Sequence, residues 1–327
     1  MILVTGGTGF LGNHLLHKLQ TQQKKIRAIY RASSIQKIDT NLKNVEWVEA
    51  DVLDIESINE AMKDVTEVYH AAAMVSFNKA EHEWMMKINV DGTENMINCA
   101  LENKIEKFGY ISSVAVLGRV GNNNHINEQT EWEKSKNNSA YATSKMLAER
   151  EVFRGAAEGL NVAIVNPSVI IGSGDWKSSS TVLFQTVNKG MPFYSTGING
   201  FVAVEDVADA IIQLMDKNIF GERFILNENN YSYQQIFTWI AESINCKPPH
   251  IKVTKWMSEI AWRLFALRTL LTGKSGIITK ETATTALLHN FYSNEKIKQR
   301  IQFQFTPIQK VIEKTGSLFL KENKKAN

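Results

Sequence analysis

The stretch Thr5-Gly-Gly-Thr-Gly-Phe-Leu-Gly12 decides how the rest of the chain is interpreted. It follows Ile2-Leu3-Val4, an apolar run typical of a buried strand, and precedes leucines at helical spacing: Leu11, Leu15, Leu16 and Leu19. Glycine lets the backbone turn tightly and lie close to a ligand. Because a helix N-terminus offers free N–H groups and a partial positive charge, the turn predicts a site for a diphosphate.

The glycine spacing differs from the common dinucleotide fingerprint, Gly-x-Gly-x-x-Gly. Here Gly6, Gly9 and Gly12 are three residues apart. An ordinary strand–helix loop is the alternative, and the strand in front and the helix behind favour a dinucleotide site. The residues of this turn that we expect to contact the cofactor are Gly6, Thr8, Gly9, Phe10, Leu11 and Gly12.

Composition indicates a globular protein and excludes several classes. The 327 residues are 43% hydrophobic and 22% charged, and suffice for one large or two small domains. A net charge of +3 gives no case for nucleic acid, and two cysteines imply neither a disulfide framework nor a metal site. Neither a signal peptide nor a membrane-spanning apolar run stands out, so we expect a cytoplasmic protein without a transmembrane segment.

Strand and helix patterns alternate through the first half of the chain. After the glycine turn, strands are predicted at 25–31, 45–50, 65–70, 108–113 and 160–165, with helices between them. This pattern predicts an α/β protein with a Rossmann-type, doubly wound parallel sheet. We expect residues 1–172 to form the dinucleotide-binding domain, rejoined by 201–227. Residues 173–200 and 228–327 would form a smaller, mainly helical substrate lobe.

Ligands of such sheets bind beyond the carboxyl ends of the strands. Asp51 follows the third strand and could accept a hydrogen bond from the adenine amino group, and small residues after the fourth strand would let a cofactor lie close. Further candidate cofactor contacts at these ends are Val52, Ala71, Ala72, Ala73, Pro167 and Ser168.

The end of the second strand bears on the choice of cofactor. An acidic residue about 20 residues past the glycines holds the ribose 2′-hydroxyl of NAD. Arg31 stands there instead, followed by Ser33, Ser34 and Lys37. A guanidinium can pair with a 2′-phosphate, so we favour NADP(H) over NAD(H); a solvated loop charge is the alternative.

Tyr141-Ala-Thr-Ser-Lys145 is the candidate catalytic motif. A tyrosine and a lysine four residues apart share one face of a helix, and a nearby ammonium favours the phenolate, which would lower the tyrosine pKa. The lysine can also donate to the nicotinamide ribose. Ser113, at the end of the fifth strand, could polarise a substrate carbonyl, with Ser112 on the opposite face. The alternative for Tyr141 and Lys145 is a surface pair, and the alternative for Ser113 is a role in the turn after the strand.

Together these motifs resemble the extended short-chain dehydrogenases/reductases, also called the NAD-dependent epimerase/dehydratase family. The matching pieces, in the family's order, are the glycine turn, Asp51-Val52, His70-Ala-Ala-Ala73, Asn89-Val-Asp-Gly-Thr93, Ser112-Ser113, Tyr141-x-x-x-Lys145 and Asn166-Pro-Ser168. The resemblance implies that Tyr141 is the catalytic acid/base, that Lys145 serves the ribose and the tyrosine, and that Ser113 holds the substrate carbonyl. It places Asn89 near the cofactor and active site.

Within the family, the Arg31 ending, Ser113-Val-Ala-Val-Leu-Gly118 and Asn166-Pro-Ser-Val-Ile-Ile-Gly172 are similar to the dihydroflavonol reductase-like and hydroxysteroid dehydrogenase-like branch. This implies reduction of a small, largely apolar carbonyl compound, or the reverse oxidation. A nucleotide-sugar epimerase or dehydratase with tightly bound NAD is the alternative, although Ser139-Ala140 replace the Pro usual before its tyrosine. A non-catalytic cofactor sensor is a third. The family implies a possible homodimer.

The sequence leaves the function of one predicted helix open. Apolar residues recur at helical spacing from Val253 to Leu271, and Trp262, Phe265 and Leu270 widen the apolar surface. We expect this helix to form core of the small lobe or one wall of an apolar substrate pocket. Lys255, Arg263 and Arg268 leave a membrane or partner contact open.

Overall fold

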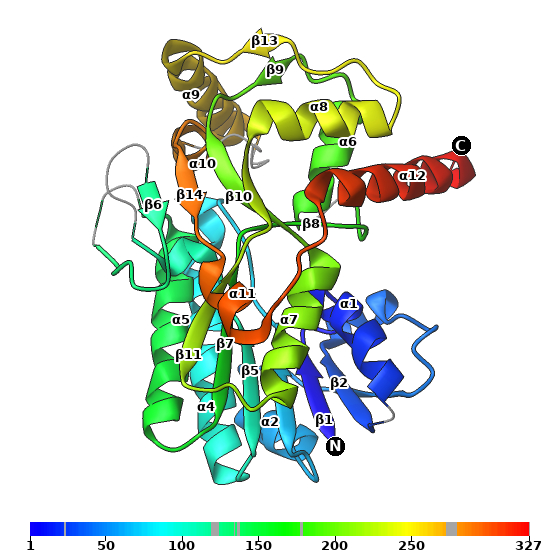
Figure 1. Ribbon diagram of the computed structural model, residues 1–327, viewed down its shortest axis with the longest axis vertical. Coiled ribbons are helices and arrows are strands. Elements are labelled where there is room, and N and C mark those ends of the chain that lie inside the picture. The colour runs from blue at the N-terminus through cyan, green and yellow to red at the C-terminus, as the bar shows by residue number, and fades with distance from the viewer. Residues whose placement is uncertain are drawn as a thin grey trace.

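The protein is built on a seven-stranded parallel sheet, seen in the lower half of Figure 1. The computed structural model describes residues 1–22, 24–118, 124–133, 135, 138–176, 179–272 and 280–326. The strand order is β11-β7-β5-β4-β1-β2-β3, which confirms the predicted doubly wound architecture. The strands are β1 (Ile2–Thr5), β2 (Ile26–Tyr30), β3 (Val45–Glu49), β4 (Glu67–His70), β5 (Lys107–Ile111), β7 (Val162–Pro167) and β11 (Glu222–Leu226).

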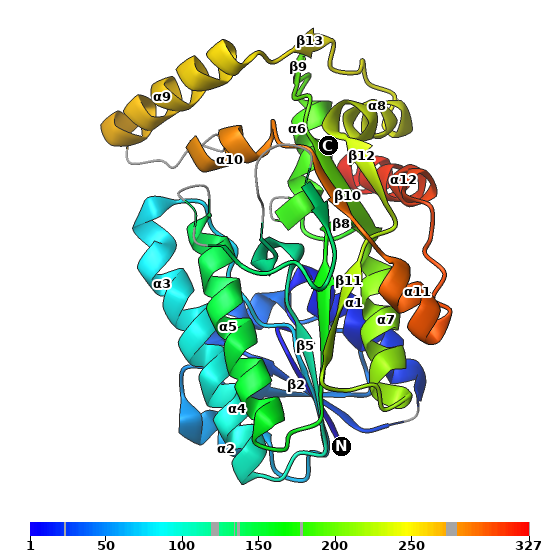
Figure 2. The same ribbon diagram turned by 60° about the vertical axis from the view of Figure 1, so that its left-hand side comes forward.

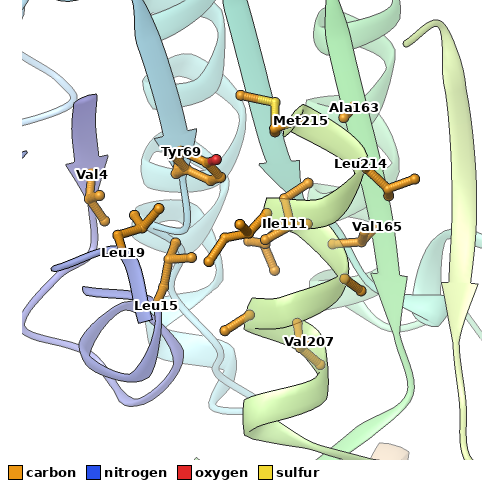
Figure 3. Close-up of a cluster of buried hydrophobic side chains, with 14 of the residues drawn as sticks. Val4, Leu15, Leu19, Tyr69, Ile111, Ala163, Val165, Val207, Leu214 and Met215 are labelled. Atoms are coloured by element: carbon orange, nitrogen blue, oxygen red, sulfur yellow. The ribbon is translucent and has the colours of Figure 1, made fainter. Parts of the chain in front are cut away.

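Helices cover both faces of this sheet, so its strands carry apolar side chains on both sides. Neighbouring Leu3 and Val4 of β1 belong to different hydrophobic clusters because successive strand residues point to opposite faces. Figure 3 shows the cluster on the Val4 side, against α1 and α7. One face is covered by α1 (Phe10–Leu19), α7 (Val204–Asp216) and α11 (Glu295–Ile301); the other by α2 (Ile55–Ala61), α4 (Gly92–Glu102) and α5 (Ala140–Ala157).

A smaller lobe lies beyond the carboxyl ends of the strands (Figure 1). Its core packs a three-stranded sheet, β12-β10-β8, against three helices. The 201–227 segment contributes to both parts. Its strand β10 joins the small sheet, whereas α7 packs on the main sheet and β11 is a strand of it. The remaining elements are β6 (Asn124–Ile126), β8 (Val169–Ile171), α6 (Val182–Asn188), β9 (Phe193–Tyr194), β10 (Ile198–Ala203), β12 (Asn229–Ser232), α8 (Tyr233–Ser243), β13 (Ile251–Lys252), α9 (Lys255–Thr272), α10 (Lys280–Thr285), β14 (Asn290–Tyr292) and α12 (Ile308–Ala326).

The helical stretch from His82 to Glu102 contains one widened turn. In it, α3 (His82–Met86) continues through a π-helical segment, Lys87–Asp91, into α4. The side chain of Asn89, inside this segment, hydrogen-bonds the loop after β4, and such widened turns are frequent at functional sites. The helix around Trp256 exists as α9, but the core assignment is wrong for Trp256, Ile260 and Leu264, which are exposed. The side chains of residues 266–272 lie outside the described set.

Candidate active site

The glycine turn between β1 and α1 is a cradle that side chains would fill. Gly6 has a φ of 72°, and a Cβ on it would lie 2.7 Å from the backbone nitrogen of Ala72. A Cβ on Gly12 would lie 2.0 Å from the carbonyl oxygen of Gly6. Gly9 stands at the N-cap of α1 with no side-chain cap, so the first amides of the helix are left for another acceptor. This geometry fits a dinucleotide diphosphate.

A buried network ties this turn to the next strand of the sheet. The Ala72 N–H donates to Thr5 Oγ1 at 3.1 Å, and Thr5 Oγ1 lies 2.7 Å from His70 Nδ1. His70 Nε2 lies 3.2 Å from Thr93 Oγ1, which donates to the Asn89 carbonyl at 2.6 Å. Burial, reinforced by Lys145, lowers the pKa of His70 to about 3. The ring is therefore neutral, and these partners place its hydrogen on Nε2.

The ends of β2 and β3 carry the polar residues that we expect to contact the adenosine half of the cofactor. Arg31 is exposed, and within the part of the chain that the structure describes its guanidinium makes no ion pair. Ser33 and Lys37, in the 3-10 turn Ala32–Lys37, are exposed beside it. Asp51 accepts a hydrogen bond from the Leu53 N–H through one carboxylate oxygen at 3.0 Å. Arg31 thus presents a positive charge at the end of β2, where we expect the 2′-phosphate of the cofactor.

Ser113 and Tyr141 come together beyond the end of β5. The Ser113 side chain lies close enough to the phenol of Tyr141 to lower its pKa, and Ser113 Oγ accepts from the Ala115 N–H at 3.1 Å. Tyr141 lies in the first turn of α5, which begins there because Ser139 caps it by accepting from the Ala142 N–H at 2.8 Å. The ring of Phe77 packs edge-on against Tyr141, with ring centroids 6.3 Å apart. The Ser112 side chain is buried and, among the described residues, has no hydrogen-bond partner.

Lys145 is buried one helical turn further along α5. Its Nζ donates to the hydroxyl of Tyr110 at 2.7 Å and to the carbonyl of Ile111 at 2.9 Å. Burial lowers the pKa of Lys145 to about 7, against the opposing effect of Glu149. The expected lowering of the Tyr141 pKa is therefore not found. Although Tyr141 keeps some exposure, burial of its phenol raises its pKa, and the nearby Ser113 hydroxyl offsets only part of the rise.

Asn89 is connected to Tyr141 by hydrogen bonds within the protein. Its amide hydrogens go to the Met74 carbonyl and to Ser144 Oγ, both at 2.9 Å, and its oxygen accepts from the Met74 N–H at 2.7 Å. Ser144 Oγ in turn donates to the carbonyl of Tyr141 at 2.8 Å. Asn89 is buried, so its side chain joins the loop after β4 to the start of α5.

A second buried hydrogen-bond network, which we did not predict from the sequence, holds the backbone carbonyl of Ser113. Asn166 Nδ2 donates to the Ser113 carbonyl at 3.2 Å and to Glu149 Oε2 at 2.7 Å. Glu149 is buried and pairs with Arg223 of β11 at 3.0 Å. The signal was present, since Tyr141, Lys145 and Glu149 are spaced four apart on one helix face. Beyond Pro167, Ser168 Oγ donates to the carbonyl of Leu226 at 3.1 Å.

The fold and this site define an enzyme of the extended short-chain dehydrogenase/reductase type. The chain belongs to the NAD dependent epimerase/dehydratase family, whose model matches residues 2–226. It is 34% identical, over 79% of its length and 77% of the relative's, to a protein of Synechocystis sp. named "Putative dihydroflavonol 4-reductase".

Solved structures agree on the fold. The crystal structure of gox2253 superposes with a TM-score of 0.81 at 28% identity, covering 99% of this chain and 98% of that one. The UDP-glucose 4-epimerase of Thermus thermophilus in complex with NAD gives a TM-score of 0.75 at 19% identity, covering 97% and 98%. At that identity the second likeness shows the fold alone. Within the described residues, no helix is long and apolar enough to cross a bilayer.

Proposed function

We propose that this protein is an NADP(H)-dependent reductase or dehydrogenase that interconverts a carbonyl and an alcohol on a small, largely apolar substrate. The observation that carries the proposal is that the side chains of Ser113 and Tyr141 lie beside each other at the same sheet edge as the glycine turn. This is the edge where a Rossmann-type sheet binds its dinucleotide, so Tyr141 would serve as proton donor and Ser113 would orient the carbonyl.

The chain's own residues have distinct tasks in this reaction. When bound, the reduced nicotinamide supplies the hydride for the carbonyl carbon. Tyr141 gives its phenolic proton to the carbonyl oxygen, and Ser113 donates a hydrogen bond that holds that oxygen as negative charge develops. The raised pKa keeps Tyr141 protonated at neutral pH, as a proton donor requires. Lys145 lies on the same face of α5 as Tyr141 and would hold the nicotinamide ribose.

Three features support the proposed cofactor. The turn at Gly6, Gly9 and Gly12 would cradle the diphosphate, and Asp51 would face the adenine. Arg31, with Ser33 and Lys37 exposed beside it, would pair with a 2′-phosphate. Further residues assigned to the cofactor are Thr8, Phe10, Leu11, Val52, Ala71, Ala72, Ala73, Asn89, Pro167 and Ser168.

An apolar substrate is favoured by the surroundings of Tyr141. Phe77 packs on its ring, and Phe77 and Val75, in the loop after β4, are exposed large hydrophobic residues. Exposed apolar side chains beside a catalytic group are typical of a surface that a ligand covers. Residues 173–200 and 228–327 would supply the rest of the substrate side.

A nucleotide-sugar epimerase or dehydratase remains the second candidate because the fold is shared with a UDP-glucose 4-epimerase. The test is a panel of apolar ketones and aldehydes with NADPH, with NADH in parallel, followed by the absorbance of the reduced nicotinamide. We expect carbonyl-dependent oxidation of NADPH. A purified protein that carries bound NAD and converts sugar nucleotides without added cofactor would overturn the proposal.

A further inference from the structure

Along its described residues, helix α9 exposes an apolar face to solvent. It lies on the outside of the small lobe and extends beyond the main body, next to α10 (Figure 2). The face toward α10 includes Ser258, which is buried and whose hydroxyl lies 3.5 Å from the Ala283 carbonyl. On the other face, Trp256 is 81% exposed, Ile260 55% and Leu264 61%. These three residues are spaced four apart, so they form one apolar stripe along the described part of the helix.

The chain around this stripe is strongly basic. Residues 247–280 contain seven lysines and arginines and a single acidic residue, Glu259. The rest of the chain holds 30 basic and 33 acidic residues, so the net positive charge of the protein comes from this segment. Lys252 and Lys255 are exposed immediately before the stripe. Arg263 pairs with Glu259 and stacks on the ring of Trp262.

We propose that α9 docks the protein onto the surface of a membrane that contains anionic lipids. An amphipathic helix with a tryptophan and aliphatic residues on one face and cations around it binds in the plane of the interface. The apolar stripe would enter the acyl boundary, where a tryptophan ring is favoured. Lys252 and Lys255 would meet the lipid phosphates, so the basic charge of the segment complements this partner.

The same charge argues against a second copy of the chain as the occupant. Pairing two α9 helices through their stripes would bring two segments of like charge together, and like charges face to face disfavour association. Docking through α9 would also bring the end of the sheet that carries the site toward the membrane (Figure 2). Helices α9 and α10 lie beyond the carboxyl ends of the strands, the end that carries Ser113 and Tyr141 (Figure 2). Membrane docking does not depend on which reaction the site performs.

The experiment is co-sedimentation of the full chain with vesicles, followed by tryptophan fluorescence. One set contains phosphatidylcholine alone, and the other contains phosphatidylcholine mixed with phosphatidylglycerol. We expect binding to the mixed vesicles with a blue shift of the emission, and at least about tenfold weaker binding in 1 M salt, where screening acts over a few ångströms. The triple variant Trp256→Ser, Ile260→Ser, Leu264→Ser should lose the binding, whereas Ile55→Ser, a 50% exposed residue on α2, should keep it.

A second variant tests the charge. Lys252→Glu with Lys255→Glu should weaken binding to the mixed vesicles, while its circular dichroism stays that of the wild type because both side chains are exposed. Three outcomes would overturn the proposal: no sedimentation with either vesicle, equal binding by the wild type and the triple variant, or a concentration-dependent dimer that the triple variant abolishes.

Discussion

Lys145 directs its ammonium at Tyr110, with 2.7 Å between Nζ and the hydroxyl oxygen, and lies 4.4 Å from the centre of the same ring. Tyr110 comes from β5 and Lys145 from α5, so this contact joins α5 to the sheet. Burial raises the pKa of Tyr110 well above its usual value, which keeps its hydroxyl neutral and able to accept from the lysine. The Lys145 side chain is therefore oriented by a buried tyrosine behind it.

Removing this hydroxyl should impair catalysis without unfolding the protein. In Tyr110→Phe, Lys145 loses one acceptor, and a hydrogen bond to a charged group contributes about 1.5–3 kcal/mol, so we expect kcat for carbonyl reduction to fall roughly tenfold or more. Steady-state kinetics measures the effect. Tyr69→Phe is the matched control because the Tyr69 hydroxyl is buried and, among the described residues, has no partner. Equal kcat values in the two variants would show that Tyr110 does not position the lysine.

The buried lysine also predicts how stability changes with pH. Burial lowers the pKa of Lys145 to about 7, from 10.5, so between these values the unfolded chain binds a proton that the folded protein lacks. The free energy of unfolding that Lys145 contributes should then be constant below about pH 7 and rise with pH above it. Urea unfolding of the wild type and of Lys145→Met across this range measures the difference. A difference that does not change with pH would contradict the buried, titrating lysine.

The ion pair behind Ser113 should matter for stability as well as for positioning. Glu149→Gln removes the charge that faces the partly buried Arg223 and should lower the free energy of unfolding by about 1–3 kcal/mol, because a buried hydrogen-bonding group loses its partner. Urea unfolding of Glu60→Gln provides the comparison: Glu60 pairs with Lys63 at the surface, and its loss should change stability by less than about 0.5 kcal/mol. If the two variants are equally stable, the buried pair contributes no more than a surface pair.

Cofactor choice should follow the charge at the end of β2. Arg31→Asp removes the cation proposed for the 2′-phosphate and introduces a carboxylate that repels it, so the ratio of NADP to NAD affinity should fall at least about tenfold. Titration of both cofactors into the purified protein gives the ratio. Lys37→Ala, which keeps Arg31, should change it less. An unchanged ratio in Arg31→Asp would remove Arg31 from the cofactor site.

The parts of this site that the sequence predicted depend on local patterns. The glycine turn is recognised from the strand and helix that flank it, and Tyr141 and Lys145 from their spacing on one helix. The contact of Lys145 with Tyr110 could not be predicted, because it depends on how far α5 lies from the sheet. The direction of the Tyr141 pKa was mispredicted for the same reason, since the lysine is engaged elsewhere and burial dominates.

Features that join distant segments were missed entirely. Glu149 and Arg223 are 74 residues apart, and no periodicity links them. The π-helical segment around Asn89 depends on the loop at Met74, whose backbone both donates to and accepts from that side chain. The exposure of Trp256 could not be read from its spacing either, because an apolar stripe predicts burial until the neighbouring elements are placed.

The most direct measurement is turnover and cofactor binding by Tyr141→Phe. This change removes only the hydroxyl that lies beside Ser113 and leaves the glycine turn and Lys145 in place. We predict that NADPH-dependent reduction of a carbonyl substrate falls by at least about a thousandfold, as loss of a proton donor requires, while the dissociation constant for NADPH changes less than about threefold. Turnover close to that of the wild type in this variant would contradict the assignment of Tyr141 as the proton donor.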